Sequence, residues 1–175
     1  MIIGLQGYAG SGKSTIADYL AKRHGFARRH IKQPLADMAR VLIRAAYPDV
    51  TPQDIENHID GPDKRRAIGR LGNRSATEIQ QFLGTEFGRN FIHPDIWLDI
   101  WSAWAAGHDK VVQESVRFAN EAERCDVIWE VRRPGYAALN GHASEALPAV
   151  ADVVLVNDGD LEALYEQVEF HLSGM

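Results

Sequence analysis

The sequence predicts a three-layer α/β protein, in which a parallel central sheet of about five strands carries helices on both faces. Short, nearly continuous apolar runs such as residues 153–156 are typical of strands that are buried on both sides. Between these runs, apolar residues recur at helical spacing, as at Leu161, Leu164 and Val168. With 175 residues and 45% hydrophobic content, the chain can bury one sizeable core, so we expect a single domain over residues 1–175.

Five apolar segments are expected to form the strands of this sheet. Amphipathic helical segments separate most of them along the chain, and this alternation is typical of parallel sheets. The expected strands are residues 2–5, 26–31, 110–113, 127–131 and 153–156.

Local signals place the ends of the expected helices. Pro34 and Pro94 suit a first helical turn, Thr51 and Ser75 suit N-cap positions, and Gly107 suits the end of a helix. The expected helices cover about residues 16–21, 34–46, 52–60, 75–87, 94–106, 118–124 and 161–172.

Two stretches lack a regular pattern. Residues 63–74 are the most polar part of the chain, and we expect a solvated loop or a short irregular helix there. Residues 132–149 contain glycine and are expected to form a lid-like loop. The basic residues of the first stretch are Lys64, Arg65, Arg66, Arg70 and Arg74.

The charge balance argues against a protein that coats nucleic acid. The formal net charge is −5, whereas a nucleic-acid surface usually carries an excess of lysine and arginine. We therefore expect any polyanion bound by this chain to be a small molecule that is held locally.

The cysteine count and the start of the chain favour a cytoplasmic location. Cys125 is the only cysteine, so no internal disulfide can form, and the first residues run straight into an apolar strand rather than a charged leader. The apolar runs are far too short to cross a bilayer. We expect a reducing compartment and no membrane attachment.

A glycine-rich segment after the first expected strand matches the phosphate-binding pattern G-x-x-x-x-G-K-[ST], and an expected helix follows it. Its glycines allow the backbone to curl so that successive N–H groups point at phosphate oxygens. The helix N-terminus adds a favourable field for negative charge. This context predicts a site for the phosphates of ATP, made by Gly7, Tyr8, Ala9, Gly10, Ser11, Gly12, Lys13, Ser14 and Thr15.

Within this loop the polar side chains have separate expected roles. Lys13 is expected to bridge the terminal phosphates, and the hydroxyl of Ser14 is expected to bind Mg²⁺. A carboxylate at the end of an apolar strand often organises such a metal ion, and Glu114 follows the strand at 110–113. Thr15 is expected to lie near the phosphates rather than on the metal.

The remainder of the sequence narrows the class of nucleotide-binding protein. A GTPase would need a guanine-reading N-K-x-D, and Asn157 with Asp158 lacks the lysine. We expect Arg117, which lies at a strand end, to bind a second phosphate group through two hydrogen bonds from its planar guanidinium. The alternative role of Arg117 is a surface ion pair with Glu121. Arg132 and Arg133 precede the lid-like loop, and are expected either to neutralise the migrating phosphoryl group or to be solvated charges.

Residues 114–123 read ESVRFANEAE, which resembles the DVRFPNEAE signature of the phage-type deoxynucleoside monophosphate kinases. Three further stretches agree with that family: QQFLGTEFGR at Gln80–Arg89, VRRPG at Val131–Gly135 and HASE at His142–Glu145. With the loop at residues 7–14 and Asn157 near the end, the resemblance spans nearly the whole chain. Ser115 departs from it, because the family has an aspartate at that position.

The resemblance implies a P-loop kinase fold, ATP and Mg²⁺ as requirements, and a deoxynucleoside monophosphate as acceptor. It implies that a helical insertion over about residues 48–107 binds the acceptor. The residues it suggests for acceptor binding are Arg74, Gln81, Glu86, Arg89, Trp97, Arg117, Asn120 and Glu121. Trp97 is expected either to stack on the acceptor base or to pack in the core with Trp101 and Trp104.

Two alternatives stay open at this point. The first is a P-loop kinase for another small acceptor, such as dephospho-coenzyme A. The second is a regulator that holds ATP without turning it over, because Ser115 removes the carboxylate that organises the metal in the resembled family. The sequence also leaves open whether the chain forms a homodimer.

Overall fold

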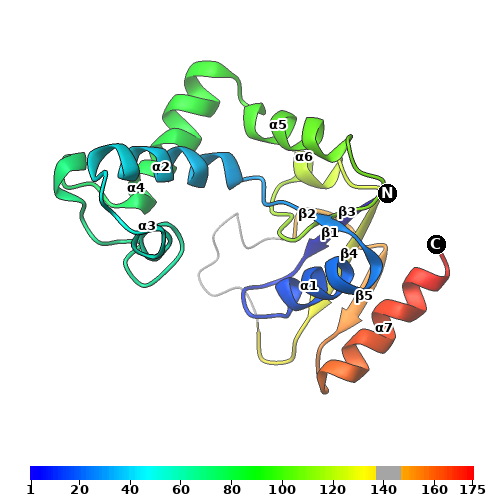
Figure 1. The fold of residues 1–175 in the computed structure, drawn as a ribbon. Coiled ribbons are helices and arrows are strands. Elements are labelled where there is room, and N and C mark those ends of the chain that lie inside the picture. Colours follow the sequence, from blue (N-terminus) through cyan, green and yellow to red (C-terminus); the bar gives the residue numbers. More distant parts are fainter. Residues whose placement is uncertain (137–146) are drawn as a thin grey trace. The chain divides into compact units, whose positions relative to one another are not determined.

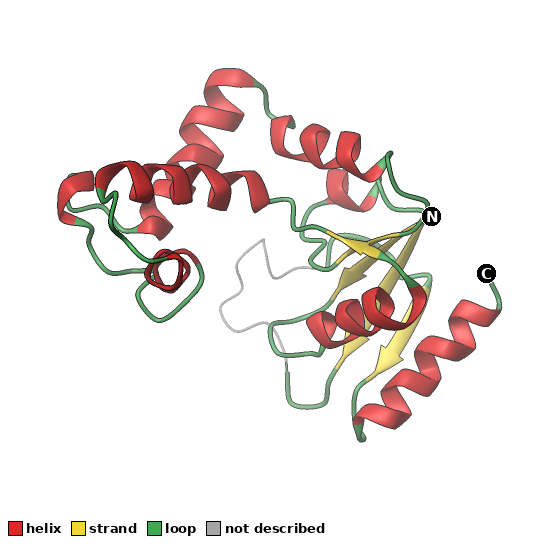
Figure 2. Ribbon diagram, in the orientation of Figure 1, coloured by secondary structure: helices red, strands yellow, loops and turns green. Residues whose placement is uncertain are grey.

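The structure, a computed structural model, describes residues 1–136 and 147–175. The described chain divides into two compact units. The first comprises Met1–His30 and Ser102–Met175, and the second comprises Ile31–Trp101. Figure 1 labels their helices and strands, and Figure 2 shows them by type. The expected single domain with an insertion at about residues 48–107 stays a prediction.

The first unit contains a parallel five-stranded sheet in the order β2-β3-β1-β4-β5. Its central strand β1 pairs with β3 on one side and with β4 on the other. The strands are β1 (Ile2–Gln6), β2 (Ala27–Arg28), β3 (Val111–Gln113), β4 (Val127–Arg132) and β5 (Val153–Val156). The predicted fold class and strand number are confirmed.

β2 is shorter than the strand expected at residues 26–31. In the described part of the sheet it is the edge strand beside β3, and the pairing joins Ala27 to Val111 and Arg28 to Val112. The strand is short because the chain leaves the sheet after Arg28 and turns at Ile31 and Lys32.

Helices cover both faces of this sheet. α1 (Lys13–His24) and α7 (Leu161–Ser173) pack on one face, where Ile16, Leu20 and Leu164 are fully buried with the strand side chains. α6 (Ala119–Ala122) covers the other face through Val116, Ala122 and Ile128. Burial of this apolar surface is the main force that holds the three layers together.

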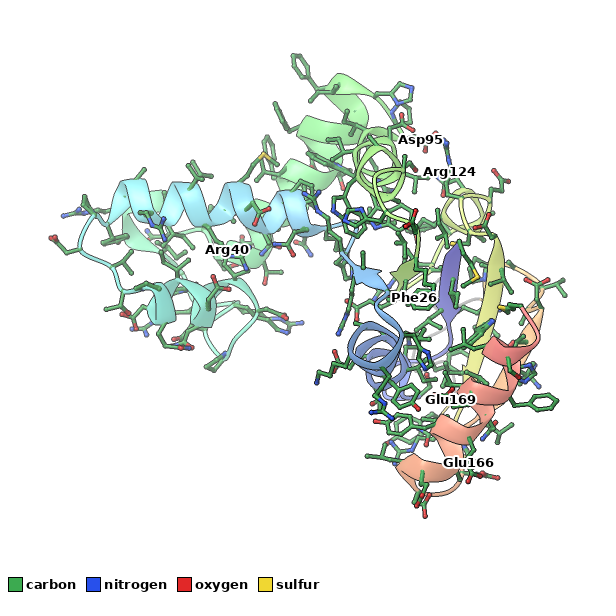
Figure 3. All side chains as sticks on the ribbon, turned by 45° about the vertical axis from the view of Figure 1, so that its right-hand side comes forward. Phe26, Arg40, Asp95, Arg124, Glu166 and Glu169 are labelled. Atoms are coloured by element: carbon green, nitrogen blue, oxygen red, sulfur yellow. The ribbon has the colours of Figure 1, made fainter. Side chains whose placement is uncertain are left out.

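The second unit is helical, with a core that joins α2 (Gln33–Ala46), α3 (Pro52–Ile59) and α4 (Ala76–Phe82). Arg40 of α2 points toward α3 (Figure 3) and binds both carboxylate oxygens of Glu56, at 2.7 and 2.8 Å. The polar stretch at residues 63–74 contains the short 3₁₀ helix η1 (Gly69–Leu71), as the expectation of an irregular helix allowed. Its Ile68 is buried in the same core.

The prediction of a single α-helix over residues 75–87 is wrong. The chain forms α4 and then a π-helix, η2 (Leu83–Ile92), before α5 (Ile96–Ala105). Gly88 leaves room for the Trp97 indole, because a Cβ at Gly88 would lie 2.4 Å from that ring. The indole N–H donates to the carbonyl of Gly84 at 2.8 Å, and a side chain that bonds a helix carbonyl is a known cause of irregular helical turns.

In a parallel sheet all carboxyl ends meet at one edge, where α/β proteins bind ligands. Here the segments that leave this edge follow Gln6 of β1, Arg28 of β2, Gln113 of β3, Arg132 of β4 and Val156 of β5. Most of the residues that the sequence singled out in the first unit lie in these segments. Among the described residues, no helix has the length and apolar character needed to cross a membrane.

Candidate functional site

The glycine-rich segment forms the connection between β1 and α1, as expected. Gly7 has φ 140° and Gly12, the N-cap of α1, has φ 112°, and side chains rarely tolerate either value. Space is also lacking: a Cβ at Gly7 would lie 2.4 Å from the Val131 carbonyl oxygen. A Cβ at Gly12 would lie 2.6 Å from Asn157 Nδ2. The curled backbone therefore depends on glycine at both positions.

Ser11 supplies an unsatisfied polar group inside this loop. Its side chain is buried, and its Oγ has no hydrogen-bond partner within the described part of the chain. Burying such a hydroxyl without a partner costs free energy, which a ligand oxygen would recover. The N–H groups of the first turn of α1 lack partners inside the helix as well. The loop thus has the unpaired donors that a phosphate group would accept from.

The Lys13 ammonium lies over the same loop. Its Nζ donates to the carbonyls of Gly7 at 2.7 Å and Tyr8 at 2.8 Å. Burial lowers the pKa of Lys13 and the nearby positive charge of Arg117 lowers it further, while Glu114 acts in the opposite direction. A partly buried ammonium beside a second positive charge favours the arrival of an anion.

Glu114 follows β3 and is mostly shielded, with a side chain that is 15% exposed. Its carboxylate binds the Arg28 guanidinium, which also binds Asp18 of α1. The sequence reasoning missed Arg28 and Asp18. No local signal identified them, because the sequence placed Arg28 inside the strand expected at residues 26–31, whereas β2 ends at Arg28. Ser14, which is exposed, and Thr15, which is half-buried, lie in the first turn of α1, and their roles toward metal and phosphate stay predictions.

Arg117 is held by the segment around it. Its Nε donates to Ser115 Oγ at 3.1 Å, and its backbone N–H donates to the Glu121 carboxylate at 2.8 Å. Glu121 is buried and therefore organises this turn, while Asn120 beside it is exposed. Ser115, which departs from the resembled family, thus contacts the arginine that we expected to bind a phosphate group.

Arg132 and Arg133 have different surroundings. Arg132 binds the buried carboxylate of Glu130, with Nε at 2.5 Å from Oε1. Arg133 donates to the Gly10 carbonyl at 3.3 Å and lies over the Tyr136 ring, 4.9 Å from its centroid. Arg133 is therefore the one of the two that reaches the phosphate-binding loop.

A pocket of about 600 Å³ opens beside that loop. It is lined by residues of the P-loop and first turn of α1, by Arg133, and by the segment from Asn157 to Leu161 that follows β5. The Asn157 amide donates to the Ser11 carbonyl at 2.7 Å, which ties that segment to the P-loop. A volume of this size suits a small molecule.

The other expected acceptor residues lie in the second unit. Gln81, Glu86 and Arg89 are exposed, and Arg74 forms an exposed ion pair with Glu78 at 3.0 Å. Trp97 is buried within that unit, where it packs on Gly88. Their role in acceptor binding stays a prediction. Residues 142–145 lie outside the described residues, as does most of the expected lid.

Comparisons with known proteins agree with this geometry. No protein-family model matches the chain. The chain is 29% identical to the "Putative deoxynucleotide monophosphate kinase" of Acanthamoeba polyphaga mimivirus, over 96% of this chain and 94% of the relative. It is 26% identical to the dephospho-CoA kinase of Synechocystis, over 95% and 92% respectively. Both relatives are named as kinases.

Among solved structures, TT1252 from Thermus thermophilus superposes with a TM-score of 0.52 and 18% identity. The superposition covers all of this chain and 97% of the TT1252 chain, which shows that the two proteins share a fold. The resemblance that the sequence motifs indicated is thereby confirmed: the chain is similar along nearly its whole length to a protein named as a deoxynucleotide monophosphate kinase.

Proposed function

We propose that this chain is a cytoplasmic kinase that transfers the γ-phosphoryl group of ATP to a deoxynucleoside monophosphate and so forms the diphosphate. The observation that carries the proposal is the P-loop with Lys13 above it and Arg117 as its electrostatic neighbour. One cation serves the donor phosphates, and the second serves the phosphate of the acceptor.

The loop backbone would hold the donor. N–H groups at the start of α1 and the Ser11 hydroxyl would bind the terminal phosphates, and Lys13 would exchange its two carbonyl partners for phosphate oxygens. The nucleoside would occupy the pocket beside Arg133 and the segment after β5. These interactions fix the donor before transfer, which supplies much of the catalysis in phosphoryl transfer.

The arginines would stabilise the transferred group. Phosphoryl transfer passes through a loose, highly charged transition state, so positioned cations do most of the work. Arg117 would bind the acceptor phosphate, oriented by its bond to Ser115. Arg133 would neutralise charge on the migrating group, because it already contacts the P-loop. Arg132 would act in that role only after leaving Glu130.

The donor set at the site fits a magnesium ion. Mg²⁺ takes oxygen ligands and usually keeps several waters, so one hydroxyl and one carboxylate are sufficient protein groups. Ser14 would bind the ion and Glu114 would hold its waters. When bound, the ion would neutralise charge on the donor phosphates.

Acceptor specificity would come from the second unit. We propose that Arg74, Gln81, Glu86, Arg89 and Trp97 contact the acceptor, together with Asn120 and Glu121 of the first unit. This assignment rests on the family resemblance. A second candidate, dephospho-CoA as acceptor, is favoured by the similarity to a dephospho-CoA kinase, at somewhat lower identity.

A coupled assay for ADP formation, run with each deoxynucleoside monophosphate and with dephospho-CoA, tests the proposal. ADP that forms only with a deoxynucleoside monophosphate supports it, and ADP that forms only with dephospho-CoA replaces the acceptor. Nucleotide binding without ADP from any acceptor would identify a regulator.

The assignment of the catalytic lysine is tested in the same assay. Lys13→Ala should lower turnover by at least about 10³-fold, because it removes the cation on the transferred phosphates, while thermal unfolding changes little. The matched control is Lys22→Ala, which removes an exposed cation from the same helix. Wild-type turnover in the Lys13 variant would refute the site.

A further inference from the structure

We propose that Arg28 is a positioning residue, which keeps the Glu114 carboxylate off Lys13 and so leaves the lysine available to the phosphates. The inference rests on the proposed function, since it deepens the account of the same P-loop. It concerns a residue that neither the phosphate-binding pattern nor the resembled motifs include.

The contacts place Arg28 between two acidic side chains. One arm of its guanidinium binds Asp18 of α1, and another arm binds Glu114 after β3. The Arg28 side chain is 29% exposed, so solvent reaches part of it while both carboxylates contact its guanidinium. A planar guanidinium with several fixed donors can serve two carboxylates at once, which a lysine does less well.

Glu114 is close enough to Lys13 to affect its charge, yet its carboxylate forms an ion pair with Arg28. The Lys13 ammonium donates to two backbone carbonyls instead. Neutral carbonyls are weaker partners than a carboxylate, so phosphate oxygens can replace them readily. A Lys13–Glu114 pair would compete directly with the phosphates.

Removing Arg28 would create that competitor. Glu114 is 15% exposed, so water would solvate it poorly, and Lys13 is a cation within its electrostatic reach. With Arg28, the side chains of Asp18, Arg28, Glu114, Lys13 and Arg117 carry one net positive charge. Without it their net charge is zero, which further disfavours a polyanion.

The test is a double-mutant cycle on nucleotide binding, measured by calorimetry with ADP in EDTA so that no metal takes part. Arg28→Ala should weaken ADP binding by about tenfold or more, the effect of losing one charged hydrogen bond. Glu114→Gln alone should bind ADP at least as well as wild type. The double variant Arg28→Ala/Glu114→Gln should recover most of the lost affinity, because the competing charge is gone.

The remaining outcomes separate this inference from the proposed function. Unchanged affinity in Arg28→Ala, or loss that Glu114→Gln does not rescue, would overturn the positioning role. If wild type itself binds no nucleotide with or without Mg²⁺, the proposed function fails instead. Lys22→Ala serves as the control for loss of a positive charge, and circular dichroism checks that each variant is folded.

Discussion

Lys13 shows how one side chain can be prepared for a ligand before the ligand arrives. The P-loop buries its ammonium, and Arg117 places a second positive charge near it. Both effects lower the pKa of Lys13, so the free protein holds this cation at a cost in free energy. A bound phosphate group would relieve that cost, and nucleotide affinity should therefore depend on the protonation of Lys13.

The sign of this dependence follows from the two states. In the complex, phosphate charges raise the pKa of Lys13 above its value in the free protein. Nucleotide affinity is therefore at its maximum at pH values below the free-protein pKa. Affinity should fall as the pH rises through that value, which lies below 10.5. Fluorescence titration with a labelled ADP between about pH 8 and 10 measures the slope, in a range where the phosphates are already ionised.

Lys13→Arg is the matched control for that titration. A guanidinium stays protonated throughout the range, so the variant should bind more weakly but with a flatter pH profile. The same decline in wild type and in Lys13→Arg would show that another group titrates.

The sequence predicted the P-loop but not the ion pairs beside it. Gly7, Gly12 and Lys13 belong to a contiguous pattern whose geometry is local, so eight residues suffice to identify it. The contacts of Arg28 join residues 10 and 86 positions apart in the chain. No local spacing reveals such a pair, because it depends on which strands become neighbours.

Among the structural elements, α4 best shows a local sequence signal that the structure obeys. Ser75 accepts from the backbone N–H of Glu78, and the Glu78 carboxylate accepts from the backbone N–H of Ser75 at 2.9 Å. This capping box satisfies donors that the first helical turn leaves unpaired. The bonds from Ser75, with Arg74 beside them, lower the pKa of Glu78 to about 2.

Ser75→Ala should lower the free energy of unfolding by about 1 kcal/mol, the usual value of an N-cap. Because the folded pKa of Glu78 is lowered, its contribution is complete above the unfolded value near 4.5 and declines as the pH falls toward 2. Urea unfolding at pH 7 and pH 3 checks both statements. The difference in the free energy of unfolding between wild type and Glu78→Gln should be smaller at pH 3 than at pH 7. An equal difference at the two pH values would contradict the cap.

The element that followed α4 was the one the sequence could not predict. The apolar spacing at Ile79, Leu83 and Phe87 fits an ordinary α-helix, but Leu83–Ile92 is a π-helix. The Trp97 indole, from the next helix, donates to the Gly84 carbonyl and packs on Gly88, and a side chain that bonds a helix carbonyl is a known source of irregular turns. Helical periodicity reports which side chains are buried, and it is insensitive to a partner that bonds the backbone.

For the whole molecule, the division into two compact units suggests how the work is shared. The P-loop, Arg28, Glu114 and Arg117 all belong to the first unit. The residues that the family resemblance assigns to the acceptor lie mainly in the second. We therefore expect the two substrates to stabilise different parts of the chain, since a ligand protects the segment whose opening would break its contacts.

Hydrogen exchange followed by mass spectrometry measures that division. A non-hydrolysable ATP analogue with Mg²⁺ should slow exchange around Lys13–His24 and the segment after β3, and leave most of Ile31–Trp101 unchanged. Adding the deoxynucleoside monophosphate should then slow exchange in the range that holds Arg74 and Trp97. The control is Lys13→Ala. This variant should lose the protection by the ATP analogue and keep the protection by the deoxynucleoside monophosphate, because its acceptor residues are intact. Protection by the acceptor confined to the first unit would contradict acceptor binding by the helical unit while leaving the P-loop assignment in place.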